Sequence, residues 1–333
     1  MSYRVTDRQT MEAPAIHLRP YAGEGDVPAV VAIDNAESEA DRISSHMTIE
    51  DVAARYRNSN DQFDPARDVT IAEMNGEPVG YAEREWVDTT DGLREYRLDG
   101  AVHPAWRRRG IGRALLAHNE QLVRQLAASQ QTERPKVLGS WSGEFQPGDH
   151  ALLAGHGVQQ VRWFFDMVRP TLDDIPDVPL PEGIEIRPAT PDLYRQIWQA
   201  DVEAFLDHWG GFDPSEESMR RHLDRPTTDP TMWVIGWDGD EVAGGVINAI
   251  HPEENEVLGV QRAWLHSVFT RRPWRRRGLA RALIARSLAV IRERGMTSAV
   301  LGVDADNPTG ALGLYEGLGF EVDARFSAWR KPL

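Results

Sequence analysis

The amino-acid sequence repeats itself across its two halves. The string WRRRGIG at residues 106–112 returns as WRRRGLA at residues 274–280, an offset of 168 residues (274 − 106). The same offset relates IHLRP at residues 16–20 to IEIRP at residues 184–188. A chain of 333 residues has room for about two domains of roughly 150 residues each. The repeat therefore predicts two equivalent domains in tandem, each long enough to bury its own core.

A proline-rich stretch separates the two repeats. Residues 170–182 contain four prolines and several acidic residues. Proline at this density cannot continue a helix or a central strand, which predicts a linker between domains. The polar residues at the start of the chain predict a flexible tail. We therefore expect a tail at residues 1–14, an N-terminal domain at 15–169, the linker at 170–182 and a C-terminal domain at 183–333.

Hydrophobic spacing and turn signals predict the same order of elements in both halves. Each half begins with a strand, continues with two helices and then has a hairpin around Asn75-Gly76 or Asp238-Gly239. In the first half we expect strands at 16–19, 69–74, 78–85 and up to 102, and helices at 26–36, 49–56 and up to 128. In the second half we expect strands from 184 and at 232–237, 241–249, 263–269, 300–303 and 320–329, and helices at 193–205, 216–223, 278–294 and 309–318. This mixture predicts a helix-covered sheet of the α/β or α+β class.

Composition restricts the classes of function. The net charge of −15 argues against a general nucleic-acid binder, because such proteins usually present a basic surface. The sequence has no cysteine, which removes disulfides, thiolate metal sites and a cysteine nucleophile. No apolar run approaches the roughly 20 residues that span a bilayer, and the first residues lack the core of a signal peptide. We predict a cytoplasmic monomer or homodimer with no metal and with no nucleic-acid or membrane partner.

Each arginine run precedes a helix rich in alanine and leucine. The first amides of a helix have no intrahelical acceptor and lie at the positive end of its dipole. Glycine lets the backbone approach a bulky anion, and arginine adds charge-assisted hydrogen bonds. Two copies in register favour a pyrophosphate cradle over a solvated charge run. The spacing does not match the dinucleotide-binding fingerprint, and the Gly-Lys-Ser/Thr of a P-loop is missing.

The segment that follows the second run carries a further signature. Residues 304–320 read DADNPTGALGLYEGLGF. Together with the arginine runs, this segment resembles the GNAT superfamily of acyl-CoA N-acyltransferases. The family's Arg/Gln-x-x-Gly-x-Gly/Ala loop is matched at 107–112 and 275–280. Its Asn…Ala-x-x-Leu-Tyr-x-x-x-Gly-Phe element is matched by Asn307, Ala311, Leu314, Tyr315, Gly319 and Phe320.

The resemblance implies a fold and an activity. Two tandem GNAT-like domains would each have a mixed, mostly antiparallel sheet with flanking helices, an arrangement similar to the mycothiol-synthase-like tandem acetyltransferases. The implied activity is an N-acetyltransferase that uses acetyl-CoA as co-substrate. The amine would attack the thioester directly, which fits a chain without cysteine.

The resemblance also implies which residues hold CoA. The pantetheine arm would pair with the main chain of Val268, Phe269 and Thr270. The pyrophosphate would lie beside Arg275, on the amides of Arg276, Arg277, Gly278, Leu279, Ala280 and Arg281. The corresponding loop of the N-terminal half comprises Arg107, Arg108, Arg109, Gly110, Ile111 and Gly112.

Two residues near the end of the chain have roles implied by the resemblance. Asn307 would help to hold cofactor or substrate, and Tyr315 would donate a proton to the departing CoA thiolate. A general base must also take a proton from the attacking ammonium. His266, on the strand before the second arginine run, is our candidate, and Asp304 and Glu203 are the alternatives.

The N-terminal half lacks part of this signature. Alignment of GHGV at residues 155–158 with GLGF at 317–320 places Leu153 opposite Tyr315, and leucine cannot donate a proton. We therefore expect the C-terminal domain to be the catalytic one. The N-terminal domain would bind CoA without catalysis, act as a structural partner of the cleft, or use Tyr96 or another acid.

Residues 203–212, EAFLDHWGGF, combine acidic and aromatic side chains ahead of the second hairpin. Carboxylates and aromatic faces suit a cationic amine, and the acidic surface would favour the same kind of substrate. Alternatively, Phe205, Trp209 and Phe212 cover the core. We therefore predict a small-molecule amine as the substrate. The alternative function is a CoA-binding sensor or interaction protein without turnover.

Overall fold

The computed structural model describes residues 15–206, 208–210, 214–225, 227–306 and 310–333. The predicted tail at 1–14 and Asn307 lie outside these residues. The described strands form one sheet of 12 strands. In order across the sheet they are β1 (Ile16–Pro20), β2 (Val69–Met74), β3 (Glu77–Asp88), β4 (Arg94–Val102), β5 (Lys136–Gly143), β12 (Glu321–Pro332), β6 (Gln159–Arg169), β11 (Ser298–Asp304), β10 (Arg262–Thr270), β9 (Glu241–Ala249), β8 (Val234–Asp238) and β7 (Ile184–Arg187).

Most neighbouring strands in this sheet are antiparallel. The parallel pairs are β4 with β5 in the N-terminal half and β10 with β11 in the C-terminal half. The two halves therefore repeat one plan, and the predicted mixed, mostly antiparallel sheet with flanking helices is confirmed.

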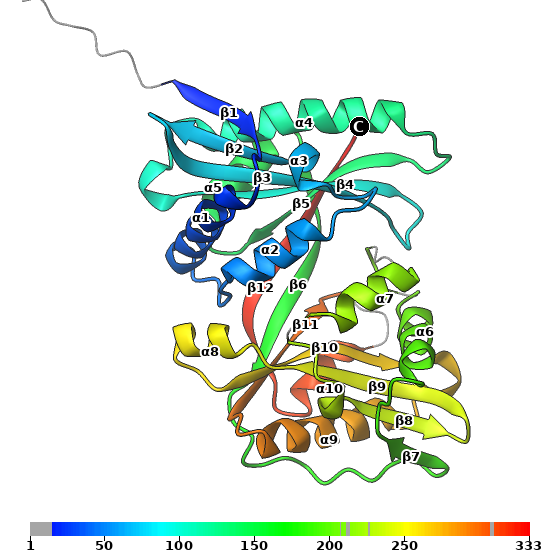
Figure 1. Cartoon of the computed structure of the whole chain (residues 1–333). Helices are drawn as coiled ribbons and strands as arrows, with labels where there is room; N and C mark the ends of the chain where they lie inside the picture. Colours follow the sequence, from blue (N-terminus) through cyan, green and yellow to red (C-terminus); the bar gives the residue numbers. More distant parts are fainter. Residues whose placement is uncertain (1–14, 207, 211–213, 226, 307–309) are drawn as a thin grey trace, which may run out of the picture.

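The two central strands are exchanged between the halves. β12, the last strand of the chain, pairs with β5 from Phe326 to Pro332 and with β6 from Glu321 to Arg330. On its other side β6 pairs with β11 of the C-terminal half. Figure 1 shows β6 and β12 running the length of the molecule as its connecting element. Each half-sheet is thus completed by a strand from the other half of the sequence.

Helices cover both faces of each half-sheet. α1 (Val27–Ala40) and α2 (Ile49–Arg57) pack on one face of the N-terminal half, and α4 (Ile111–Ser129) packs with α5 (Pro147–Gly155) on the other. In the C-terminal half, α6 (Tyr194–Phe205) and α7 (Glu216–Leu223) are opposed by α9 (Leu279–Glu293) and α10 (Ala311–Glu316). The short helices are α3 (Pro65–Asp68) and α8 (Pro252–Leu258). Figure 1 shows α4 and α9 at the far ends and α2 and α7 toward the middle.

The predicted elements agree well with the observed ones in most of the chain. β2, β9 and α7 have the predicted bounds. Between residues 136 and 169 the structure has β5, α5 and β6, for which the sequence analysis made no prediction. The proline-rich stretch has neither helix nor strand, but its Leu172 is only 2% exposed in the core under α9. No helix among the described residues is long and apolar enough to cross a membrane.

The exchange predicts that a substitution in the last strand damages the first half of the molecule. Trp329 of β12 is 7% exposed and belongs to the core that contains Tyr96 and Leu138. Trp329→Ala should lower the free energy of unfolding by about 3–5 kcal/mol. Hydrogen exchange should show lost amide protection in β5 and α4. Glu321→Ala, at the exposed start of the same strand, serves as the control. Loss of protection confined to the C-terminal half would contradict the exchange.

Candidate active site

Both arginine loops have the same backbone conformation. Arg108 and Arg276 have φ values of 64° and 61°, and Gly110 and Gly278 have φ values of 88° and 81°. Positive φ is uncommon in residues other than glycine, so the shared pair of left-handed positions marks one specific turn. In each loop the glycine caps the start of the helix that follows, α4 or α9.

This turn leaves a row of backbone amides without acceptors. The first backbone bond of α9 runs from the Ala282 amide to the Gly278 carbonyl, at 3.1 Å. The amides of residues 276–281 make no backbone hydrogen bond within the described part of the chain. Arg275 supports the turn by donating from Nε to the carbonyl of Thr270, at 2.9 Å. A helix start with such amides and with flanking cations is suited to bind an anion.

In the C-terminal half the two strands beside this loop separate. β10 and β11 pair only from Arg262 to Trp264, against residues 298–300. The register between β10 and β9 shifts between Leu265 and Ser267, so His266 is the extra residue of a β-bulge. A bulge bends its strand and interrupts pairing. An opening therefore lies between the two strands beyond His266.

The open edge of β10 has groups that a ligand could satisfy. The Arg271 amide donates to the carbonyl of Ala243 in β9. Successive amides of a strand point to opposite edges, so the Thr270 amide points away from β9 and into the opening. The hydroxyl of Thr270 is buried and has no hydrogen-bond partner among the described residues. An extended ligand can add to such an edge as a further strand. Val268, Phe269 and Thr270, the residues that the resemblance implied for pantetheine, lie along this part of β10.

Tyr315 is a buried phenol on α10. Its side chain is 7% exposed and packs edge-on against Phe320, with ring centroids 6.0 Å apart. Burial raises the pKa of Tyr315 to about 12, so the phenol keeps its proton at neutral pH. No hydrogen bond joins its hydroxyl to another described residue. A protonated, unengaged phenol is suited to donate a proton.

His266, on the bulge, belongs to a group of stacked rings. Its Nε2 lies 3.0 Å from Nε2 of His251, and its ring stacks on Trp264 at 5.9 Å. In such a contact one nitrogen donates and the other accepts, so at least one ring is neutral. His266 is an exposed residue, but desolvation by the protein packed around its ring lowers the pKa of His266 to about 3, and the nearby His251, Arg225 and His222 act in the same direction. The imidazole is therefore neutral at physiological pH.

Asp201 of α6 faces the bulge, and the sequence analysis missed it. The hydroxyl of Ser267 donates to its Oδ1 at 2.6 Å. Burial raises the pKa of Asp201 to about 6. The signal that could have identified it is its place on the apolar face of the helix, one turn after the buried Ile197 and one turn before Ala204.

The two alternative bases are engaged in ion pairs. Asp304 accepts from Nε of Arg162 at 2.7 Å, and Glu203 accepts from Nε of Arg271 at 2.8 Å. Asp201 has no ion-pair partner among the described residues. It therefore lies beside the bulge with the Ser267 hydroxyl as its hydrogen-bond partner and without a neutralising cation.

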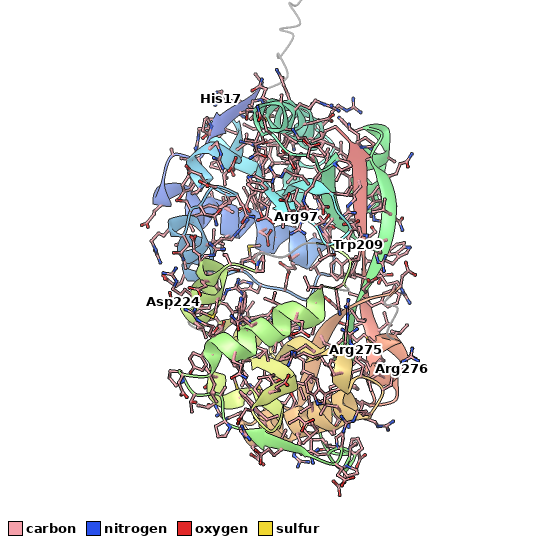
Figure 2. The ribbon with its side chains drawn as sticks, turned by 90° about the vertical axis from the view of Figure 1, so that its right-hand side faces the viewer. His17, Arg97, Trp209, Asp224, Arg275 and Arg276 are labelled. Atoms are coloured by element: carbon pink, nitrogen blue, oxygen red, sulfur yellow. The ribbon has the colours of Figure 1, made fainter. Side chains whose placement is uncertain are left out.

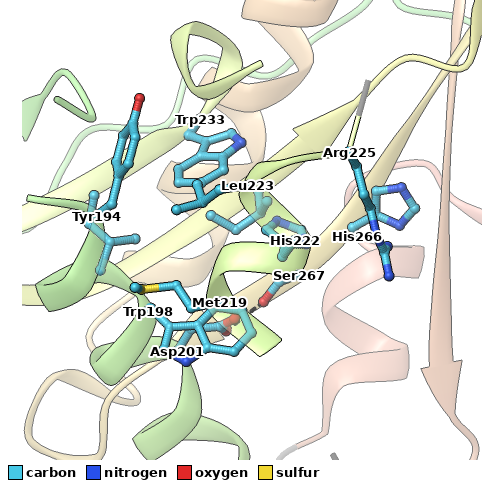
Figure 3. Close-up of a pocket in the computed structure, with 12 residues that line it drawn as sticks. Tyr194, Trp198, Asp201, Met219, His222, Leu223, Arg225, Trp233, His266 and Ser267 are labelled. Atoms are coloured by element: carbon cyan, nitrogen blue, oxygen red, sulfur yellow. Dashed lines mark hydrogen bonds between the residues drawn. The ribbon is translucent and has the colours of Figure 1, made fainter. Parts of the chain in front are cut away.

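Two cavities meet at the bulge. The first has a volume of about 270 Å³ and lies between α6, α7 and the sheet, as the close-up in Figure 3 shows. The second has a volume of about 570 Å³ and lies between the two halves of the molecule. Both are lined by Trp198, Asp201, His266 and Ser267.

The wall of the second cavity comes from both halves. Trp209 lies at their junction (Figure 2), with its ring 5.7 Å from Phe164 and 6.5 Å from Trp141. The guanidinium of Arg330 lies 3.9 Å from the Trp209 ring centre, within cation–π distance. The Thr90 amide donates to the carbonyl of Gly210 at 2.9 Å. The segment predicted to shape the substrate site thus bridges the halves, although Phe212 lies outside the described residues.

The N-terminal half has the same loop but a different opening. β4 and β5 pair only from Arg94 to Arg97, yet β4 stays in continuous register with β3 and has no bulge. The Val102 amide, which corresponds to that of Thr270, donates to Glu37 at 3.4 Å. The Trp141 amide on the opposite strand donates to Asp99 at 3.1 Å. Side chains of the half itself occupy the edges that a ligand would use.

Two further features distinguish the N-terminal half. Arg107 forms a bidentate ion pair with Asp41, and both of its hydrogen bonds are 2.7 Å long. Part of the loop's positive charge is therefore already neutralised. Leu153 takes the place of Tyr315, because the Val158 amide bonds to Leu153 as the Phe320 amide bonds to Tyr315. Tyr96, which the sequence offered as an alternative acid, is 1% exposed and donates to Gln130.

Comparisons with known proteins agree with this architecture. The model of the acetyltransferase (GNAT) family matches residues 194–320, and that of an acetyltransferase (GNAT) domain matches residues 65–138. A GCN5-related N-acetyltransferase from Sphaerobacter thermophilus superimposes with a TM-score of 0.72 at 26% identity, over 95% of each chain. A tandem GNAT protein from the clavulanic acid biosynthesis pathway superimposes with a TM-score of 0.71 at 19% identity, over 96% of this chain and 98% of its own.

Named relatives match over almost the whole sequence. A mycothiol acetyltransferase of Geodermatophilus obscurus is 31% identical, over 92% of this chain and 94% of its own. A mycothiol acetyltransferase of Salinispora tropica is also 31% identical, over 98% and 95%. The resemblance seen in the sequence is therefore confirmed, and the chain belongs to the GNAT family of N-acetyltransferases as a tandem of two such domains.

Proposed function

We propose that the C-terminal half transfers an acetyl group from acetyl-CoA to the amine of a small molecule. The observation that carries this proposal is the bulge at His266, which joins a free strand edge, an anion cradle and the carboxylate of Asp201 in that half. In the other half the corresponding edges are occupied by Glu37 and Asp99.

Acetyl-CoA would bind along the separated strands. Its pantetheine arm would pair with the main chain at the open edge of β10 from Val268 to Thr270. Its pyrophosphate would accept from the amides of residues 276–281, with the loop arginines adding charge. The thioester would then lie near the bulge, where both cavities meet.

In the proposed reaction the amine attacks the thioester directly. Asp201 takes a proton from the ammonium, and the nitrogen lone pair then forms the bond to the carbonyl carbon. The carbon–sulfur bond breaks, the sulfur takes the proton of Tyr315, and the phenol regains a proton from the new amide nitrogen. One ammonium and one thioester thus give one amide, one thiol and one released proton. A carboxylate with a pKa of about 6 accepts a proton more readily than an imidazole with a pKa of about 3.

The N-terminal half acts in this proposal as a structural partner. It supplies Trp141 and Phe164 to the second cavity and strand β6 to the C-terminal half-sheet. Binding of CoA there would require Glu37 and Asp99 to release two main-chain amides. This cost favours a structural role over a second, silent CoA site.

Replacement of the phenol tests the proton donor. Tyr315→Phe should lower kcat by about 100-fold or more while acetyl-CoA affinity changes little, because the hydroxyl acts on the leaving group. Thiol release over a panel of amines measures the rate, and calorimetry measures the affinity. Tyr96→Phe in the N-terminal half is the matched control and should leave kcat unchanged. An unchanged kcat in Tyr315→Phe would rule out the assigned role, and no thiol release with any amine would favour a sensor without turnover.

Replacement of the carboxylate tests the proton acceptor. Asp201→Asn should lower kcat/KM by about 100-fold and remove an acidic limb near pH 6 from the rate profile. The pKa of Asp201 is raised in the folded state, so its ionisation costs stability as pH rises through about 6. The Asn variant lacks this cost, so its Tm at neutral pH should be at least as high as that of the wild type. Asp224→Asn, an exposed carboxylate at the end of α7, is the control. A retained acidic limb in Asp201→Asn would exclude this assignment.

The number of CoA molecules per chain tests the difference between the halves. Calorimetry should find one equivalent of CoA for the wild-type chain. Gly278→Val should abolish this binding, because valine strains a backbone with φ of 81° and crowds the cradle. Gly110→Val introduces the same strain in the N-terminal loop and should leave CoA affinity unchanged. Two equivalents in the wild type, or lost binding in Gly110→Val, would show that the N-terminal loop holds CoA.

A further inference from the structure

The first cavity has walls of a distinct chemical kind. We call it the aromatic chamber. Its apolar wall comes from α6, α7, the residue before β8 and strand β9, and it consists of Tyr194, Ile197, Trp198, Met219, Leu223, Trp233 and Ile247. The rings of Tyr194 and Trp233 are 5.7 Å apart, and His222 lies 6.0 Å from Trp198 and 6.1 Å from Trp233. Aromatic rings therefore surround the chamber on several sides.

The chamber is larger than a packing defect. Protein interiors are close-packed, and voids larger than a water molecule are few. A cavity of about 150 Å³ lined by apolar side chains is known to hold benzene. At about 270 Å³ the chamber has room for an aromatic ring with a short chain or for two fused rings. Its dimensions suit a specific apolar group.

The chamber leads directly to the reacting atoms. Asp201, His266 and Ser267 line both the chamber and the second cavity. Figure 3 shows the hydrogen bond from Ser267 to Asp201 at the edge of the apolar wall. A group held by the rings would thus place an attached nitrogen at Asp201, beside the strand opening. The chamber is a side-chain pocket for the acceptor.

The charges of the lining restrict the acceptor further. Among the described residues that line the chamber, Asp201 is the one carboxylate, and the Arg225 guanidinium lies with His266 at one end (Figure 3). A second ammonium on the acceptor would meet Arg225 without a carboxylate to pair with. Trp233 Nε1 on the apolar wall has no hydrogen-bond partner among the described residues and could bond to one hydroxyl group. Several hydroxyl groups on one acceptor would lie mostly against indole and aliphatic surface, which costs free energy. Polyamines and hydroxyl-rich amino sugars therefore fit the chamber poorly.

From this geometry we infer that the acceptor is a primary monoamine that carries an aromatic or similarly sized apolar group. The apolar group occupies the aromatic chamber, and the nitrogen contacts Asp201. This inference rests on the proposed acetyl transfer in the C-terminal half and names the class of its substrate. It is separable from that proposal, because a different amine class would leave the transfer itself intact.

Filling the chamber tests the inference. Met219→Trp, on the inner side of α7, should raise KM for 2-phenylethylamine about tenfold or more, because the ring loses the apolar surface that it would bury. KM for ethylamine should change little, since its short chain does not need the chamber. Arg220→Trp adds the same side chain to the exposed side of the same helix and serves as the control. CoA affinity, measured by calorimetry, should be equal in all three proteins.

A panel of acceptors completes the test on the full wild-type chain. With acetyl-CoA, kcat/KM should be highest for 2-phenylethylamine and tryptamine, and at least about tenfold lower for ethylamine, glucosamine and spermidine. Higher kcat/KM for glucosamine or spermidine, or an unchanged KM for 2-phenylethylamine in Met219→Trp, would overturn the inference while the transfer stands. If no amine is acetylated, the inference is tested by measuring the binding of 2-phenylethylamine to the CoA-loaded protein. Binding that Met219→Trp weakens supports the chamber and refutes the transfer, and absence of binding overturns the inference.

Discussion

The pairing of β12 with both β5 and β6 is the constraint on which the rest of the structure depends. The last strand of the chain fills a gap in the first half-sheet, and β6 fills the equivalent gap in the second. Backbone groups in the middle of a sheet must be paired, so neither half can complete its hydrogen bonding alone. Trp329 reinforces this dependence, because it is buried in a core that otherwise belongs to the first half. The two halves thus form one continuous sheet, and they meet at a seam that consists of the paired strands β12 and β6.

Both halves have an arginine loop of one conformation, and under the proposed function the surroundings of the loops decide which of them serves the reaction. Arg108 and Arg276 share a left-handed φ, so the loops cannot be told apart by backbone shape. The halves differ at the neighbouring strand edges. A single extra residue, His266, opens β10, whereas β4 keeps its register and its edge amide is held by Glu37. The strand edge of the C-terminal half is thus open because of one bulge, and that of the N-terminal half is closed by the carboxylates of Glu37 and Asp99.

Much of this arrangement could be predicted from the sequence, and the reasons for the failures are physical. The repeat of WRRRG predicted two equivalent domains, and the alignment of Leu153 with Tyr315 agrees with matching backbone bonds at both positions. These features are local, and local patterns carry turn and helix signals. The exchange of β6 and β12 has no local signal in the sequence. The hydrophobic pattern of a strand shows which of its faces is buried, but not which strand it pairs with. Asp201 was missed because its importance comes from the distant Ser267, which only the fold places beside it.

The position of the seam also explains why a second domain without a free strand edge would be retained. The cavity between the halves is lined by Trp141 and Phe164 of the N-terminal half and by Trp198 and Asp201 of α6. Removal of the N-terminal half would expose this wall to solvent and would also remove β6 from beside β11. Water would then reach the bulge more freely, and electrostatic contacts to the reacting groups weaken when water enters. Under the proposed function, the N-terminal half therefore contributes through the wall of the cleft and through strand β6.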